Sequence, residues 1–358
     1  MSAVLDNPAA ATEPTAAAAR PASPNQRAWA RFKRNRLGYV SLWVFGALLL
    51  LATFAEVFSN DRPLLARING QWYAPVFANP TEKALGGDFF TGADWKDPFI
   101  DDLLAKPGNW ALLPPNPHSA DSLDYFDPAL PPAEPSRRNY LGTDSKGRDL
   151  LARLLYGFRV SVWFALALTV VGTAIGVAMG ALQGYFGGRT DLFVQRLIEI
   201  WGALPELYLL IIFASIFEPS LLLLLVLLSL FGWIGLSDYV RAEFLRNRGL
   251  EYVKAARALG LGNGRIIWRH VLPNSLTPVI TFLPFRMAGA ILALTSLDFL
   301  GLGVPASVPS LGELLKLGKE NLDAWWIIVS TFCLLVGTML LLTFIGDALR
   351  DAFDTRKS

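Results

Sequence analysis

The chain has 358 residues, of which 53% are hydrophobic and only 17% are charged. Soluble globular domains usually carry about a quarter charged residues, so this composition argues against a water-soluble protein. The formal net charge of +2 lacks the basic excess typical of nucleic-acid-binding proteins. The single cysteine, Cys333, excludes an internal disulfide, and the two distant histidines provide no metal-ligand spacing. The sequence therefore predicts an integral membrane protein that binds neither nucleic acid nor metal.

The segment 1–36 is predicted to be a disordered, basic cytoplasmic tail. Residues 1–24 are rich in alanine and proline and contain few large apolar side chains, a composition that supports no packed core. The basic residues that follow, with no acidic residue among them, are Arg27, Arg31, Lys33, Arg34 and Arg36. Because basic residues beside a membrane span favour the cytoplasmic side, the N-terminus is expected to be cytoplasmic. The length of this tail also distinguishes the following apolar run from a secretory signal peptide.

Six apolar segments are candidates for transmembrane helices, which need about 20 mostly apolar residues to cross the bilayer. They are 37–57, 160–182, 201–217, 221–234, 276–297 and 324–346. The third contains Pro205 and Glu206, and the fifth contains two prolines and Arg286. An even number of spans returns the C-terminal tail, 348–358, to the cytoplasm. We therefore predict an all-α polytopic membrane protein with its transmembrane core at 159–347.

A long polar segment, 58–158, separates the first two spans and is expected to lie on the outer side. It is rich in aspartate and proline, with aromatic residues scattered through it. Its basic residues do not contradict this topology, because loops longer than about 60 residues translocate largely regardless of charge. The aromatic residues favour partial folding. The sequence leaves open whether the segment packs as a small domain or lies as an ordered loop over the membrane.

Glycines recur every four residues in the second span, at Gly172, Gly176, Gly180, Gly184 and Gly188. This spacing places them on one helix face, where the absence of side chains allows a second backbone to approach closely. The pattern predicts a packing seam in a polytopic bundle. The partner helix could belong to this chain or to a second subunit.

The loop at about 239–274 carries the most specific pattern in the chain. Residues 251–259 are rich in helix formers, a cluster of glycines interrupts them, and 265–271 can form a second short helix before Pro273. One modest apolar face is predicted on the first helix by the spacing of Tyr252, Ala255, Ala256 and Leu259. Two short helices joined at a glycine elbow are typical of a docking element for another protein.

This loop resembles the EAA motif of ABC-importer permeases. The motif consists of Glu-Ala-Ala, a glycine four positions later, and a Leu-Pro pair further on. The sequence matches it at Ala255, Ala256, Gly260, Leu272 and Pro273, and departs from it at Lys254 and His270. The resemblance implies contact with separate ATPase subunits, and the candidate coupling residues are Tyr252, Lys254, Ala255, Ala256, Leu259, Gly260, Leu272 and Pro273.

Two further stretches resemble dipeptide and oligopeptide permeases of the DppC/OppC type, and most closely those of the YejE type. Residues 140–149 are similar to the LGTDxxGRD signature, and 297–313 are similar to the SFLGLG…PSWG stretch, with Asp298 and Leu311 at variant positions. The resemblance covers about 30–56 and 139–352. It implies six transmembrane helices of the MetI-like type I importer architecture, with a large extracytoplasmic insertion between helices 1 and 2.

The implied function is that of a permease subunit moving oligopeptides or peptide-like solutes across the bacterial inner (plasma) membrane by alternating access. The sequence has no G-x-x-x-x-G-K-[ST] phosphate loop, so this chain is predicted not to be an enzyme and to bind no cofactor. The resemblance supplies the partners: ATPase subunits that use ATP and Mg²⁺, a second permease subunit and an outer solute-binding protein.

Several charged residues are open to two interpretations. Arg286 and Glu206 are candidates for the translocation path, because charge within a span is costly and normally faces a cavity or a partner. The alternative, which we favour for Arg286, is a structural ion pair with Glu206 or with the second permease. Asp144, Arg148 and Asp149 are candidates for an outer gate or a binding-protein contact. The favoured alternative for these three is helix capping with local salt bridges.

Two other functions compete with the importer hypothesis. An ion-gradient-driven secondary transporter would tend to show repeated halves with ionisable groups at the midplane, and the sequence has no evident internal repeat. A membrane enzyme acting at the outer face would need a nucleophile with a base, or a metal site, within 58–158. That segment offers only His118 and scattered carboxylates.

Overall fold

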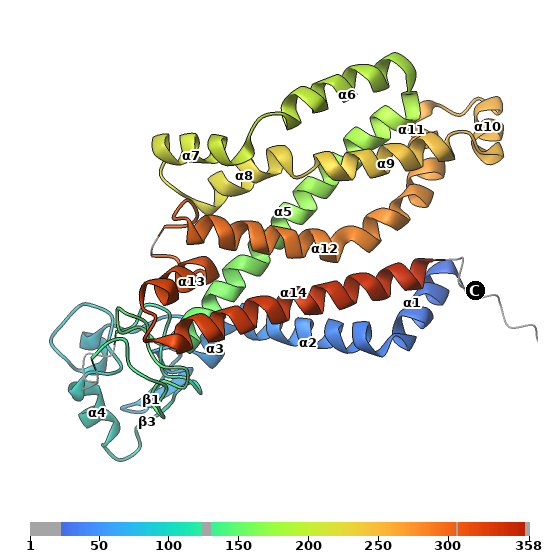
Figure 1. Ribbon diagram of the computed structural model, residues 1–358. Coiled ribbons are helices and arrows are strands. Elements are labelled where there is room, and N and C mark those ends of the chain that lie inside the picture. Colours follow the sequence, from blue (N-terminus) through green and yellow to red (C-terminus); the bar gives the residue numbers. More distant parts are fainter. Residues whose placement is uncertain (1–22, 124–129, 306, 355–358) are drawn as a thin grey trace, which may run out of the picture.

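The computed structural model describes residues 23–123, 130–305 and 307–354, and the expected disorder of residues 1–22 lies outside this part of the chain. Four helices are long and apolar enough to cross a membrane: α2 (Arg36–Thr53), α5 (Leu150–Phe186), α12 (Leu272–Phe299, continuous with the turns from Asn263) and α14 (Trp325–Phe353). Figure 1 shows these helices running lengthwise through the bundle. Up to six spans result if each of two bent helix pairs counts as one.

The predicted third and fourth spans fall on the two bent pairs, and the bounds compared below count each pair as one span. Helices α6 (Gly188–Gly202) and α7 (Glu206–Ile216) meet at 64°, and α8 (Leu221–Phe231) and α9 (Ile234–Asn247) meet at 41°. The first break contains Pro205, which lacks an amide donor and disfavours helical geometry in the residue before it. The third span therefore begins well before the predicted residue 201, and the fourth continues beyond the predicted residue 234.

The ends of the predicted segments also need correction. Helix α1 (Pro24–Arg34) replaces part of the predicted disordered tail, because Ser23 caps it and Phe32 packs against α14. The second span begins at Leu150 rather than within 159–160, since the Asp149 side chain accepts a hydrogen bond from the Ala152 amide and starts the helix there. At the other terminus α14 continues to Phe353, so most of the predicted tail 348–358 is helical.

The outer insertion is a small folded unit with its own apolar core. The predicted first span, 37–57, breaks after Thr53, and the short helix α3 (Ala55–Phe58) leads from it into the insertion. The insertion contains an antiparallel sheet in the order β2 (Gln71–Tyr73), β1 (Leu65–Ile68), β3 (Trp110–Leu112), a 3-10 turn η1 (Glu82–Leu85) and helix α4 (Pro98–Leu104). Ile68, Leu85 and Ile100 are almost fully buried in its core. This sheet is the departure from an all-α fold within the described residues.

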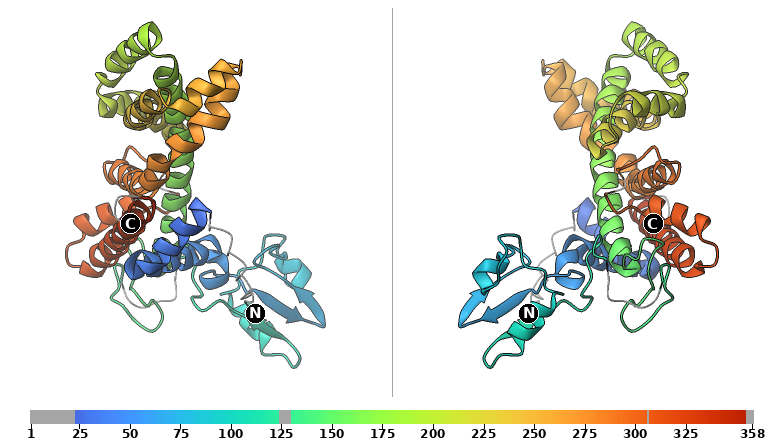
Figure 2. Two further views of the ribbon diagram at one scale, coloured as in Figure 1. Left: turned by 90° about the vertical axis from the view of Figure 1, so that its right-hand side faces the viewer. Right: turned by 90° about the vertical axis from the view of Figure 1, so that its left-hand side faces the viewer.

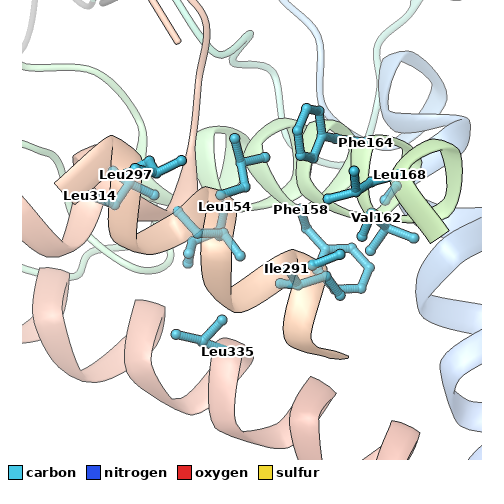
Figure 3. Packing of buried hydrophobic residues seen from close by; sticks show 14 of the residues in the cluster. Leu154, Phe158, Val162, Phe164, Leu168, Ile291, Leu297, Leu314 and Leu335 are labelled. Atoms are coloured by element: carbon cyan, nitrogen blue, oxygen red, sulfur yellow. The ribbon is translucent and has the colours of Figure 1, made fainter. Parts of the chain in front are cut away.

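Helix α5 lies at the centre of the bundle. Figure 3 shows its residues Leu154, Phe158 and Val162 in one apolar cluster with Ile291 of α12 and Leu335 of α14. Helix α13 (Leu311–Glu320) packs against the outer part of the same cluster. The core therefore links the motif that precedes α5 to the last three helices of the chain.

The glycine face of α5 packs against α9 of the same chain. A Cβ atom added at Gly176 would lie 3.0 Å from the Trp233 carbonyl oxygen, and one added at Gly180 would lie 2.5 Å from the Ser237 carbonyl oxygen. At Gly188 an added Cβ atom would meet nothing within 4 Å. The predicted seam is therefore an intrachain helix contact that ends before Gly188.

The two ends of the bundle carry different elements. Figure 1 shows α10, α1 and the C-terminal end of α14 at one end, and the insertion with α4 and the sheet at the other. The views in Figure 2 show that the insertion also projects to one side of the helices. The loop with the EAA-like pattern is thus separated from the insertion by the full length of the bundle.

Candidate coupling site and buried charges

The candidate coupling loop contains the first of the two short helices predicted from the sequence, but the second is not separate, because the turns from Asn263 run directly into α12. Helix α10 (Glu251–Ala258) is followed by the glycine elbow, α11 (Asn263–Ile266) and one π-helical turn, η2 (Ile267–Val271). Gly260 has a φ of +77°, and its amide donates to the Arg257 carbonyl oxygen at 3.0 Å. A residue with a Cβ atom is strained in this left-handed conformation. The elbow therefore requires glycine for its backbone shape, although the space around Gly260 is open.

Helix α10 presents different residues to the bundle and to the surroundings. Val253 and Ala256 are buried in a cluster with Ile266 and Phe244. Tyr252 and Ala255 are exposed, and Leu259 is 81% exposed. The single apolar face predicted from the spacing is thus divided, with Ala256 on the inner side. We refer to Tyr252, Ala255 and Leu259 as the exposed α10 face.

The remaining motif residues lie around this helix. Lys254, at the position where the motif has glutamate, pairs with Glu251 through an Nζ–Oε1 distance of 2.8 Å, and both side chains are exposed. Leu272 is buried, and Pro273 is exposed in the first turn of α12. Asn274 donates from Nδ2 to the Tyr252 hydroxyl at 3.0 Å, which connects the start of α12 to α10.

The structure separates Arg286 from Glu206. Arg286 donates from Nη2 to the Gly232 carbonyl oxygen at 2.9 Å, at the break between α8 and α9. Glu206 begins α7 and lines an apolar cavity of about 240 Å³ with Trp201 and Phe213. Within the described residues no ion pair joins the two, so the predicted pair with Glu206 is wrong. Arg286 instead bonds to a carbonyl group exposed by the bend.

The charges before α5 form a buried cluster at the end of the bundle that carries the insertion. Asp144 accepts hydrogen bonds from the amide of Arg148 at 3.0 Å and from its Nε at 2.7 Å. Glu313 of α13 pairs with Arg148 at 3.3 Å and also with Arg153, which is completely buried. Asp149 accepts from the amide of Ala152 and from Asn116 Nδ2, each at 2.8 Å. Burial raises the pKa of Asp149 above its ordinary value, against these hydrogen bonds.

The structure thus places Asp144, Arg148 and Asp149 in a network of local contacts, as the alternative of capping and salt bridges describes. Arg153 and Glu313 complete this network; both lie in or beside the family-like stretches of the sequence, but the sequence assigned them no role. Glu313 lies far along the chain from the signature at 140–149, so only the fold brings it to the cluster. Asn274, which bonds to Tyr252 of α10, and Tyr185 of α5, whose hydroxyl donates to Asn263 at 2.8 Å, were not predicted either, because the fold alone brings them to the loop.

Comparison with known proteins shows which family has a sequence similar to that of this chain. Residues 156–358 match the family described as "Binding-protein-dependent transport system inner membrane component", and residues 23–78 match the "N-terminal TM domain of oligopeptide transport permease C". One relative is the inner membrane ABC transporter permease protein YejE of Escherichia coli (strain K12). It is 48% identical over 334 residues, which cover 93% of this chain and 98% of that protein.

Two other relatives are more distant. The peptidoglycan transport system permease protein YejE of Agrobacterium fabrum is 44% identical over 93% of each chain. The oligopeptide transport system permease protein OppC of Haemophilus influenzae is 35% identical over 61% of this chain and 70% of that protein. A chain of the methionine ABC transporter MetNI, in an inward-facing conformation, aligns with a TM-score of 0.47 and 18% identity over 57% of this chain and 96% of that chain.

The relatives are permease subunits of ABC transporters rather than enzymes. This confirms the prediction that the chain is not an enzyme. It does not favour the alternative of an ion-gradient-driven secondary transporter. The family match covers all the helices from α6 onward and most of α5. The coupling elbow and the helices that hold it lie inside that match. With this family match over more than half of its length, the chain belongs to the inner-membrane permease components of binding-protein-dependent ABC transport systems.

Proposed function

We propose that this permease subunit carries oligopeptides or peptide-like solutes inward by alternating access. The relatives named for oligopeptide transport and for peptidoglycan transport support this substrate class, since both names describe solutes that contain or resemble short peptides. The peptide signature before α5 and the variant stretch after α12 support the same class. Uptake assays with a labelled tripeptide and with a muropeptide would separate the two kinds of solute.

The coupling loop is proposed to dock on a separate ATPase subunit. The observation that carries this proposal is the exposed α10 face, held on a glycine elbow at the end of the bundle opposite the insertion. Apolar side chains that remain exposed beside a fixed turn suit a protein contact. ATP and Mg²⁺ would be bound by two ATPase subunits and not by this chain. Closure of those subunits would rock the helices as rigid bodies and expose the path to each side in turn.

Two further partners complete the proposed assembly. A second permease subunit would contact apolar surfaces of the bent helices that this chain leaves exposed, for example at Phe193, Ile200 and Tyr208. A solute-binding protein would deliver the substrate at the insertion. Glu206 lines a cavity beside α7 and remains the better candidate for the path, because Arg286 already has a partner in Gly232.

Both termini are proposed to be cytoplasmic. The basic residues before α2 support this orientation through the positive-inside rule. The position of α1, α10 and the end of α14 at one end of the bundle supports it as well, because the ATPase subunits that bind α10 would be cytoplasmic. A reporter enzyme that is active only in the cytoplasm should be active when it is fused to either terminus.

The docking proposal is tested with Ala255→Asp in the complete transporter reconstituted in proteoliposomes. A charge at this exposed position should reduce ATP-driven peptide uptake at least tenfold, because it introduces an unpaired charge into the ATPase contact. Ala30→Asp, at an exposed alanine of α1 at the same end of the bundle, is the matched control and should leave uptake unchanged. Wild-type uptake by Ala255→Asp, and equally by Gly260→Asp, would show that the ATPase docks elsewhere.

A further inference from the structure

A single tyrosine hydroxyl contacts both helices of the coupling loop. Tyr185 lies at the end of α5 and is 4% exposed. Its hydroxyl group donates to Asn263 Oδ1 at 2.8 Å, and Arg257 Nη2 lies 3.5 Å from the same oxygen. Arg257 belongs to α10 and Asn263 begins α11, so the two partners stand on opposite sides of the glycine elbow.

Other contacts fix Tyr185 in this position. Its carbonyl oxygen accepts a hydrogen bond from Arg248 Nη1 at 3.2 Å, and the Arg257 guanidinium lies over its ring, 5.8 Å from the centroid. The ring belongs to the apolar cluster that contains Val253 and Ala256. The preceding residue, Gly184, packs so closely on α9 that an added Cβ atom would overlap Phe244. These contacts therefore bury the ring independently of the hydroxyl group.

Helix α5 leads from this contact to the other end of the molecule. It is a single helix of 37 residues, which at 1.5 Å per residue is about 55 Å long. Its N-cap is Asp149, and its first turn contains Arg153, which pairs with Glu313 of α13 in the buried cluster. A movement of the elbow that is passed to α5 can therefore reach the outer end of the bundle without crossing a helix break.

We infer that the Tyr185 hydroxyl is a positioning group that ties the coupling elbow to α5, so that ATP-driven movement of α10 and α11 is transmitted along this helix. Tyr185 itself touches neither the substrate nor the ATPase in this account. It acts through Asn263 and Arg257, which it holds in a fixed relation to α5. The inference rests on the proposed docking of α10 on an ATPase subunit.

The test compares two tyrosine-to-phenylalanine variants of the same helix. Tyr185→Phe keeps the buried ring and removes the hydroxyl group. Tyr156→Phe is the matched control, because Tyr156 lies in the outer half of α5 and its hydroxyl donates to the Ser59 carbonyl oxygen at 3.0 Å. Each variant is purified as the complete transporter, and peptide uptake and ATP hydrolysis are measured together in proteoliposomes with the binding protein present.

Tyr185→Phe is expected to lower the amount of peptide transported per ATP hydrolysed at least fivefold, with the normal amount of ATPase retained on purification. Tyr156→Phe should leave this ratio unchanged. Asn263→Ala should reproduce the Tyr185→Phe defect, and the double variant should be no worse than either single variant. An unchanged ratio for Tyr185→Phe overturns the inference. So does a loss of bound ATPase that accounts for the whole decrease in uptake, since the hydroxyl group would then be merely structural.

Ala255→Asp separates this inference from the proposed function. If Ala255→Asp abolishes uptake while Tyr185→Phe transports normally, the ATPase docks on α10 and the movement is transmitted by other contacts. If both variants transport normally, the docking proposal itself is wrong.

Discussion

Among the residues that the structure describes, Arg286 has no ion pair, and it shows how a charged side chain can be kept within a span by another kind of partner. A bend in a transmembrane helix leaves carbonyl groups without their usual amide donors, and the bilayer offers no water to replace them. Arg286 supplies a donor at such a bend, where its Nη2 bonds to the Gly232 carbonyl oxygen. An added Cβ atom at Gly172 would lie 2.8 Å from the same Nη2 atom, so the glycine makes room for the guanidinium group.

We therefore expect Arg286→Met to act on stability rather than on transport. Loss of the bond should lower the stability of the permease by about 1 kcal/mol, the typical net contribution of one hydrogen bond, since Gly232 is exposed in this chain. Thermal unfolding in detergent measures this, with Arg196→Met as a control because Arg196 is largely exposed. Uptake per folded transporter should be close to wild type. A selective loss of uptake in a stable Arg286→Met protein would instead make Arg286 a residue of the path.

At the scale of elements, the packing of α5 on α9 depends on the missing side chains of one helix face. Ser237 and Leu236 of α9 occupy the space beside Gly180 and Gly176. Gly46 in α2 offers the opposite situation, because an added Cβ atom there would meet nothing within 4 Å. The two positions allow steric packing to be separated from the intrinsic effect of replacing glycine in a helix.

Gly180→Ala is expected to destabilise the permease by about 1–3 kcal/mol, because the added methyl group forces α5 and α9 apart. Gly46→Ala should be neutral or slightly stabilising, since it only restricts the backbone of α2. Melting temperatures of the two purified variants provide the comparison. Equal effects at both positions would mean that α5 and α9 do not pack as described.

The outer ends of α5 and α13 are joined by buried charge. Arg153 is completely buried and pairs with Glu313, whereas the Lys146 side chain is 52% exposed and lies 3.7 Å from the same glutamate. Glu313→Gln should cost about 1–3 kcal/mol, because it removes the carboxylate that Arg148 and Arg153 share, while Asp121 and Asp144 remain beside Arg153. Lys146→Gln should cost less than about 1 kcal/mol. Chemical unfolding of the two variants measures the difference, and a small effect of Glu313→Gln would show that water reaches Arg153.

For the whole molecule, the sequence predicted those features that depend on neighbouring residues. The elbow at Gly260 follows from local composition and from the backbone freedom of glycine, and the structure has this turn. The long apolar runs of α5 and α14 are sufficient to predict these two helices as transmembrane spans. The three family-like stretches also indicated the family, because each is specific and they occur in the expected order.

Other features depend on residues that are distant in the sequence. The spacing in α10 could not show that Ala256 turns toward Phe244, because the position of the bundle decides which side is buried. Only Pro205 indicated the 64° bend between α6 and α7. The Gly232 carbonyl oxygen that bonds to Arg286 is available because the chain also bends between α8 and α9. The sheet in the insertion joins β1 and β2, near the start of the polar segment, to β3 in the middle of it, and short strands of this kind give little periodic signal.

The central claim is that α10 is the contact through which a separate ATPase moves this bundle. Site-directed cross-linking tests it most directly, with Leu259→Cys as the only cysteine after Cys333→Ser, in membranes that contain the whole transporter. A short bifunctional reagent should join residue 259 to an ATPase subunit, and the yield should change when ATP is trapped on the transporter. Cross-linking to another protein alone, or reaction only with reagents dissolved in lipid, would contradict the account.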